Sequence, residues 1–142
     1  MKKIYHNFIT KEDLTELKKI EINSNTRILH KPNGIVDRVI NALKKDFTFE
    51  IKELSYYRLE KTTENGHNWH KDTGSNNHMP WCQVGCSILL ESDCEGGKTY
   101  YKENDKVTTA ERGIFDLIAH TSDVLHKVDA PNAYRLAFLI FI

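Results

Sequence analysis

The chain has 142 residues, with 20 Lys and Arg against 20 Asp and Glu, so its formal net charge is zero. This length fits one domain with a single core, and we expect that domain to span residues 1–142. A neutral chain has no basic excess with which to release counterions, which argues against a nucleic-acid partner. No run approaches the roughly 18 consecutive apolar residues of a membrane-spanning helix, so no membrane partner is expected.

The N-terminus and the cysteines favour a cytoplasmic location. The basic first residues are not followed by an apolar segment, unlike those of a signal peptide. The three cysteines, Cys82, Cys86 and Cys94, are odd in number and clustered, which does not indicate a disulfide framework. We therefore expect a reducing compartment, and we expect the chain to be a monomer.

Two helices are predicted in the first third of the chain. Thr10 and Asp13 have the spacing of a capping box, and the apolar residues that follow recur every three positions to about Asn23. A second helix is predicted after the turn signal at residues 32–34. Its apolar stripe consists of Ile35, Val39, Ile40 and Leu43.

From about Phe47 the hydrophobic period changes to two, which predicts about eight strands. They lie at residues 54–59, 67–70, 83–90, 98–101, 107–109, 113–118, 124–128 and 134–142. Turn signals separate them at residues 65–66, 95–97, 104–105, 112–113 and 131–132. This order predicts an α+β, mainly β fold, with helical support over about residues 8–46 and a sandwich or barrel over 47–142.

The sequence His70-Lys71-Asp72 is the first feature that suggests chemistry. In an extended segment, residues two apart point to the same face, so an imidazole nitrogen and a carboxylate oxygen can converge on one point. A single His-x-Asp also arises by chance in a chain with seven histidines. The alternative interpretation is a solvated turn.

His126 is the second feature. It has the same strand parity as the apolar Val124 and Val128, so it is expected on a buried face. The alternative is a core histidine with satisfied hydrogen bonds. Together with His70 and Asp72, it would complete a facial triad that holds non-haem Fe(II) and leaves positions open.

Arg135 is the third feature, because it starts the most apolar segment of the chain. It shares its face with Ala137, Leu139 and Phe141, while the opposite face is also apolar. A buried guanidinium needs an anion, and arginine matches a carboxylate with two parallel hydrogen bonds. The partner is either a distant Asp or Glu or the carboxylate of a ligand.

These motifs occur in an order that resembles the 2-oxoglutarate- and Fe(II)-dependent dioxygenases, and most closely their prolyl 4-hydroxylase-like branch. The ordered set is His70-x-Asp72, Glu95-Gly96-Gly97 before a strand, the segment that begins at Gly113, His126, and Arg135 nine residues after His126. The resemblance covers about residues 54–142 and implies a double-stranded β-helix of the jelly-roll or cupin type, with the two N-terminal helices as support.

The resemblance also implies roles for single residues. His70, Asp72 and His126 would bind Fe(II), and Arg135 would pair with the C5 carboxylate of 2-oxoglutarate. Family members often add a tyrosine hydroxyl from the first barrel strand, for which Tyr57 is the candidate and Leu59 the alternative occupant. Two positions depart from the family pattern, Leu139 and Leu89, where polar side chains are frequent.

The activity implied by the resemblance is hydroxylation of a C–H bond with O₂, releasing succinate and CO₂, supported by ascorbate. The leading substrate is a prolyl residue in a peptide or protein. Trp69, His78 and Trp81 flank a polar loop beside the metal motif and are the candidate substrate contacts. The alternatives are a hydroxylase of a free amino acid or small metabolite, and a cupin-like module that binds metal or 2-oxoglutarate without turnover.

Overall fold

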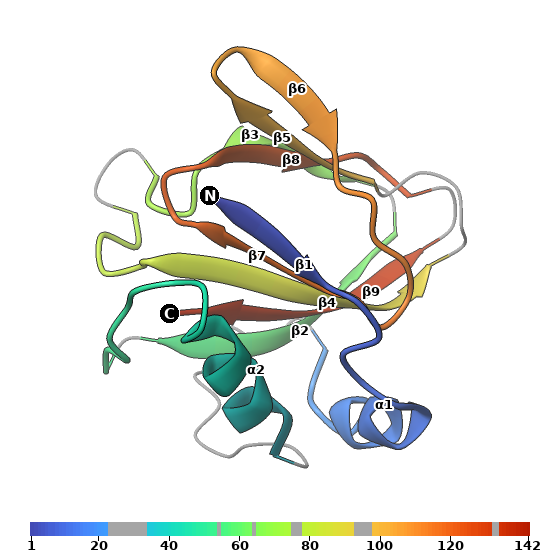
Figure 1. Ribbon diagram of the computed structural model, residues 1–142. Helices are drawn as coiled ribbons and strands as arrows, with labels where there is room; N and C mark the ends of the chain where they lie inside the picture. The colour runs from blue at the N-terminus through green and yellow to red at the C-terminus, as the bar shows by residue number, and fades with distance from the viewer. Residues whose placement is uncertain (23–33, 54, 64, 75–77, 93–97, 132–133) are drawn as a thin grey trace.

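The computed structural model describes residues 1–22, 34–53, 55–63, 65–74, 78–92, 98–131 and 134–142. Within these ranges the protein is mainly β, with two helices packed against one of two antiparallel sheets (Figure 1). The elements are β1 (Lys2–Tyr5), α1 (Lys11–Leu17), α2 (Ile35–Leu43), β2 (Tyr56–Thr62), β3 (His67–His70), β4 (Val84–Ser92), β5 (Thr99–Glu103), β6 (Lys106–Thr109), β7 (Leu117–Thr121), β8 (Leu125–Val128) and β9 (Arg135–Phe141). None of the described helices is long and apolar enough to cross a membrane.

The chain passes back and forth between the two sheets, as in a jelly roll. The five-stranded sheet has the order β1-β7-β4-β9-β2, and the four-stranded sheet has the order β3-β8-β5-β6. Every neighbouring pair is antiparallel. Residues far apart in sequence therefore meet between the sheets, which positions the site described below.

The main core lies between the five-stranded sheet and the helices. On β9, alternate residues face this core, and they include Leu136, Phe138 and Ile140. Leu17 of α1 and Val39 of α2 pack against them from the helical layer, fully buried. The other face of β9 carries Arg135, Leu139 and Phe141, which line a cavity between the sheets.

The N-terminal region has the predicted helix start but differs from the prediction in the helix end and in an additional strand, β1. The capping box of Thr10 and Asp13 is present with both hydrogen bonds. The helix ends at Leu17, however. The backbone N–H groups of Lys19 and Ile20 then bond to carbonyls three residues back, and Ile22 bridges to Leu59. The predicted helix end at Asn23 lies outside the described residues. Strand β1 was not predicted, because its two lysines hide an edge strand that pairs with β7.

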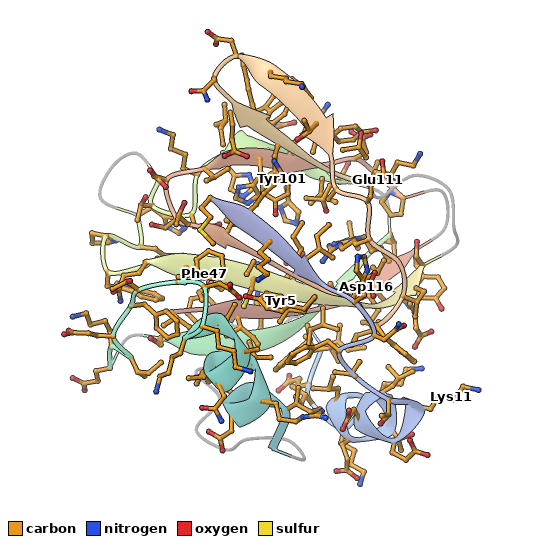
Figure 2. The ribbon with its side chains drawn as sticks, in the orientation of Figure 1. Tyr5, Lys11, Phe47, Tyr101, Glu111 and Asp116 are labelled. Atoms are coloured by element: carbon orange, nitrogen blue, oxygen red, sulfur yellow. The ribbon has the colours of Figure 1, made fainter. Side chains whose placement is uncertain are left out.

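The barrel strands follow the predicted order, with one clear shift. The segment from Gly113 to Asp116 is a turn, and β7 begins only at Leu117. The Asp116 carboxylate accepts hydrogen bonds from the backbone N–H groups of Gly113 and Asn7, and Phe115 has a φ of 72° (Figure 2 labels Asp116). This local network replaces the start of the predicted strand.

The predicted turn at Asn104-Asp105 is a two-residue hairpin between β5 and β6. Both residues have positive φ, as the mirror-image turn of a tight hairpin requires. Other predicted features lie outside the described residues. They are Pro32-Asn33, Cys94, Glu95-Gly96-Gly97 and Asn132.

Candidate metal centre

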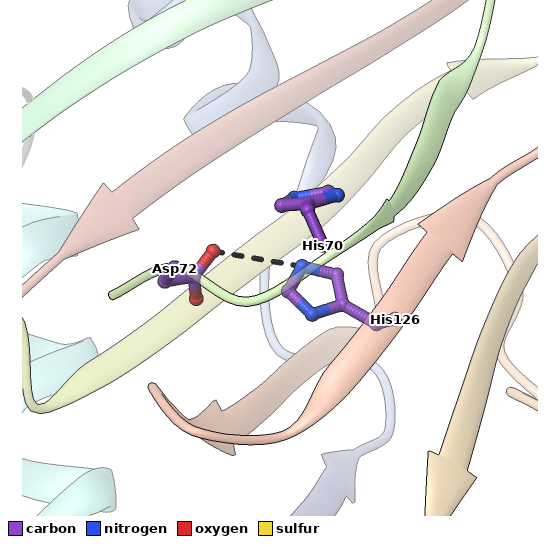
Figure 3. Close-up of side chains that lie close together, drawn as sticks. All are labelled: His70, Asp72 and His126. Atoms are coloured by element: carbon purple, nitrogen blue, oxygen red, sulfur yellow. Dashed lines mark ion pairs between the residues drawn. The ribbon is translucent and has the colours of Figure 1, made fainter. Parts of the chain in front are cut away.

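Strands β3 and β8 bring two histidines together. His70 and His126 are direct partners in this antiparallel pair, and their ring centroids are 4.3 Å apart. Asp72 follows β3 by two residues, and its backbone N–H donates to the carbonyl of Ser122. One ligand atom from each of His70, Asp72 and His126 lies within 4.8 Å of the other two (Figure 3). This spacing is compatible with a single metal ion.

Both histidines have one ring nitrogen held by the backbone. Nδ1 of His70 lies 2.6 Å from the carbonyl oxygen of Asn68, and Nδ1 of His126 lies 2.9 Å from that of Val124. Because a carbonyl only accepts, each Nδ1 donates its proton, which leaves the Nε2 lone pair for a metal.

The charge states also suit a metal ligand set. Burial, with the nearby His120, lowers the pKa of His126 to about 4, so its imidazole is neutral at neutral pH. Burial alone would raise the pKa of Asp72, but the hydrogen bond with His120 and the neighbouring histidines hold it below its ordinary value. A neutral imidazole and an ionised carboxylate are the forms that bind metals.

His120 on β7 also belongs to the site, although its sequence context does not mark it as a functional residue. Its Nε2 lies 2.7 Å from Asp72 Oδ2, and its Nδ1 lies 2.8 Å from the hydroxyl of Tyr101. The available signal was a histidine in the apolar run Leu117-Ile118-Ala119, with the strand parity of Ile118. Its partners, however, are far away in sequence.

The triad opens onto an inner cavity of about 110 Å³, and Arg135 lies at its far end. Arg135 is 3% exposed, and its Nε has no hydrogen-bond partner within the described part of the chain. Burial lowers the pKa of Arg135, partly offset by the charge of Glu60. Glu60 is already engaged with Arg58 at 2.7 Å and His67 at 2.9 Å. Of the two partners expected for Arg135, this geometry favours a ligand carboxylate.

A second guanidinium lies behind the far end of the cavity. Arg112 donates to the Ser87 hydroxyl at 2.7 Å and to the Thr99 hydroxyl at 3.4 Å, and both hydroxyls line the inner cavity. Burial, with the charge of Arg135, lowers the pKa of Arg112 to about 9. No carboxylate of the described residues forms an ion pair with Arg112. No local sequence pattern marks Arg112, Ser87 and Thr99 as site residues, because their proximity depends on pairing between distant strands.

Tyr57, the candidate second contact of the cosubstrate, lies on the face of β2 opposite the inner cavity. Tyr57 and its alternative Leu59 are buried in the core that faces the helices. Their neighbours of opposite parity, Arg58 and Glu60, line the inner cavity instead. The register explains the difference, because Tyr57 pairs with the core residue Ile140.

A broader outer cleft of about 630 Å³ adjoins the inner cavity. His70 and Asp72 line both spaces, so the metal ligands lie where the two meet. Trp69 and His78, the candidate substrate contacts, line the outer cleft. Trp81 is not among the described residues that line it. Its ring packs 5.9 Å from that of Tyr56, which does line the cleft.

Known structures with a similar fold were found, although no similar sequence was. No protein-family model and no curated protein matches the chain. A Pseudomonas putida prolyl-4-hydroxylase superimposes with a TM-score of 0.73 at 12% identity, covering 99% of this chain and 83% of the other. A Trichoplax adhaerens prolyl hydroxylase, in complex with a peptide fragment of the hypoxia inducible factor oxygen degradation domain, has a TM-score of 0.66 at 13% identity, with coverage of 99% and 83%.

A 2OG-Fe(II) oxygenase family protein from Burkholderia pseudomallei also matches, with a TM-score of 0.64 at 11% identity, covering 99% of this chain and 82% of the other. At such identities the likeness concerns the fold. The chain therefore shares the fold of the prolyl 4-hydroxylases and the 2OG-Fe(II) oxygenases, and the resemblance predicted from its sequence motifs is confirmed at that level.

Proposed function

We propose that this protein is an Fe(II)- and 2-oxoglutarate-dependent dioxygenase that hydroxylates a prolyl residue in a peptide or protein, with release of succinate and CO₂. One observation carries the proposal. Two histidines and one carboxylate face the same inner cavity as a buried arginine, whose Nε has no hydrogen-bond partner among the described residues. We also infer that the sheets form a double-stranded β-helix, because from β2 onward successive strands pass between the sheets, with β5 and β6 as a hairpin.

The donor set fits Fe(II). His70, Asp72 and His126 offer two imidazoles and one carboxylate, the facial set typical of non-haem iron oxygenases. Iron bound there would supply the O₂ chemistry that amino-acid side chains cannot perform. The protein's own contribution is to hold the three ligands in place and to exclude water from the inner cavity.

The far end of the cavity fits the distal carboxylate of 2-oxoglutarate. Arg135 supplies the charge, and the Ser87 and Thr99 hydroxyls supply further donors. Because both hydroxyls accept a hydrogen bond from Arg112, their own protons are free to point toward an anion. These two hydroxyls replace the tyrosine expected at Tyr57. The arginine and the metal site each match one negative charge of the dicarboxylate.

The outer cleft is the proposed substrate site. It is larger than the inner cavity, and it reaches the metal ligands past Trp69, Tyr56 and His78. Aromatic side chains of this kind suit an extended peptide, since they offer broad contact area at low conformational cost. The Trichoplax adhaerens neighbour is in complex with a peptide, which supports a peptide as substrate.

The test is succinate release from 2-oxoglutarate in the presence of Fe(II), O₂, ascorbate and a pool of proline-containing peptides. We expect release that depends on the peptides, together with a 16 Da mass increase on a proline located by mass spectrometry. His126→Ala serves as the control and should abolish both signals. Binding of 2-oxoglutarate without turnover would instead indicate a non-catalytic module, and oxidation of free amino acids would assign a small-molecule substrate.

A further inference from the structure

A buried hydrogen-bond chain connects both sheets to the candidate metal ligand Asp72. Tyr101 comes from β5 of the four-stranded sheet, and His120 comes from β7 of the five-stranded sheet. The Tyr101 hydroxyl lies 2.8 Å from His120 Nδ1, and His120 Nε2 lies 2.7 Å from Asp72 Oδ2. Tyr101, His120 and Asp72 are 0%, 7% and 5% exposed, and Figure 2 shows Tyr101 in the space between the sheets.

The direction of these hydrogen bonds follows from the donor inventory. An ionised Asp72 only accepts, so His120 Nε2 donates to it. In a neutral imidazole the other nitrogen then accepts, and the Tyr101 hydroxyl donates to it. Tyr101 therefore selects the tautomer of His120 that presents an N–H group to Asp72.

Strand β4 leaves room for this pair at Gly85. A Cβ atom on Gly85 would lie 1.9 Å from Asp72 Oδ2 and 2.9 Å from His120 Nε2, closer than real Cβ contacts. The backbone itself does not require glycine here, because the φ angle of Gly85 is outside the left-handed region. The absence of a side chain at this position thus serves the contact between Asp72 and His120.

We propose that His120, oriented by Tyr101, is a positioning residue that commits Asp72 Oδ2 to a hydrogen bond and presents only Oδ1 to the metal. Oδ1 lies on the side of the other ligands, 3.5 Å from His126 Nε2 (Figure 3). A carboxylate that binds through one oxygen uses one coordination position, whereas a bidentate carboxylate uses two. Bound in this way, Asp72 would supply one ligand atom beside the two imidazoles, and the chain would supply three ligands to a metal ion. This inference rests on the proposed metal site.

The experiment measures Co(II) binding and the visible absorption spectrum of the Co(II) protein, which reports coordination number and geometry. His120→Phe removes the donor to Asp72 and keeps a ring in the space. We expect about 10- to 100-fold weaker Co(II) binding and an altered spectrum. His120→Gln keeps an N–H donor at a similar reach and should restore most of the affinity and the wild-type spectrum. A purely structural role would not show this rescue.

A matched pair of tyrosine variants provides a second measurement, because a Tyr→Phe substitution removes only a hydroxyl group and disturbs packing little. Tyr101→Phe removes only the hydroxyl that selects the tautomer, and we expect a few-fold weaker Co(II) binding. Tyr100→Phe changes the neighbouring residue, whose ring lies under Lys127 instead, and should leave Co(II) binding unchanged. Circular dichroism checks each fold, and if His120→Phe does not fold, this pair decides.

The outcomes separate the two proposals. Wild-type Co(II) binding with an unchanged spectrum in His120→Phe and unchanged affinity in Tyr101→Phe would overturn the role of His120 alone. Failure of the wild-type protein to bind Co(II), Fe(II) or Mn(II) would overturn the proposed metal site itself, and the role of His120 with it.

Discussion

At the metal end of the inner cavity, both imidazoles and the carboxylate already have hydrogen-bond partners within the chain. At the far end, Arg135 Nε has no partner among the residues that the structure describes. The backbone holds Nδ1 of His70 and His126, and His120 holds Asp72. Arg112 at the far end donates to the hydroxyls of Ser87 and Thr99, and it forms no ion pair with a carboxylate of the described part of the chain. The difference indicates that the protein itself orders the metal end, whereas the far end holds a buried guanidinium donor that the proposed 2-oxoglutarate carboxylate would satisfy.

Among substitutions that keep every candidate metal ligand, the largest effect should come from Gly85→Ala, which acts on the metal end. The added methyl group would displace the Asp72 carboxylate, because its Cβ would lie 1.9 Å from Oδ2. We expect metal affinity to fall by roughly 100-fold or more, since a ligand and its hydrogen-bond partner are disturbed together. Metal titration followed by calorimetry measures the change.

Gly113→Ala is the matched control for this substitution. Among the described residues, a Cβ atom on Gly113 would meet only Asp116 Oδ2, at an ordinary contact distance of 3.9 Å. Metal affinity should remain at the wild-type value in this variant. Equal affinities for Gly85→Ala and the wild-type protein would show that Asp72 is not held as tightly as its contacts indicate.

The metal end should also make the metal-free protein sensitive to acid. The pKa of His126 is about 4 in the folded protein against an ordinary value of 6.5, so the unfolded chain binds this proton more readily. The resulting stability is fully present above about pH 6.5 and is lost as the pH falls toward 4. The free energy of unfolding should decrease by up to about 3 kcal/mol over this window. Urea unfolding at several pH values measures it.

Comparison with His126→Asn isolates this contribution. The variant lacks the titrating group, so its stability should change less between pH 6.5 and pH 4 than that of the wild-type protein. The lowered pKa of Asp72 acts in the same direction, but only below the ordinary carboxyl pKa of 3.8, and so outside this window. Parallel pH profiles for the two proteins would contradict the assignment.

Arg135→Met tests the far end and should have opposite effects on binding and stability. Loss of the charged hydrogen bonds should weaken 2-oxoglutarate binding by about 10- to 100-fold. Metal affinity should be unchanged. The ligand-free protein should become more stable by about 1 to 2 kcal/mol, because a buried cation without a bound anion is replaced by an apolar side chain.

Calorimetric titration with Mn(II) in place of Fe(II) and thermal unfolding measure these two effects. Weaker 2-oxoglutarate binding together with higher stability would identify Arg135 as an anion anchor. Removal of a structural arginine would instead destabilise the protein. Lower stability together with wild-type 2-oxoglutarate affinity would refute the role of Arg135. The corresponding change at the metal end, His126→Ala, should abolish metal binding instead.

How far the sequence predicts this site depends on the range of the interactions involved. The strand alternation that placed Arg135 with Leu139 and Phe141 is a local property, and the structure has these three on one cavity wall. Adjacent Tyr56 and Tyr57 could not be told apart in the same way, because their faces depend on the register with β9. His120 requires Asp72, 48 residues away, and Tyr101, so no local pattern reveals its role.

The smallest effect should come from Thr99→Val, which removes one hydroxyl at the far end and keeps the side-chain shape. Thr99 accepts from Arg112 at 3.4 Å, a long hydrogen bond, while Ser87 accepts at 2.7 Å. We therefore expect only a two- to fivefold loss of 2-oxoglutarate affinity, corresponding to about 0.5–1 kcal/mol. Ser87→Ala should cost more, because it also leaves Arg112 with a weaker set of acceptors. If both variants bind 2-oxoglutarate as the wild-type protein does, Arg135 alone holds the carboxylate, and Arg112 then only packs behind the cavity.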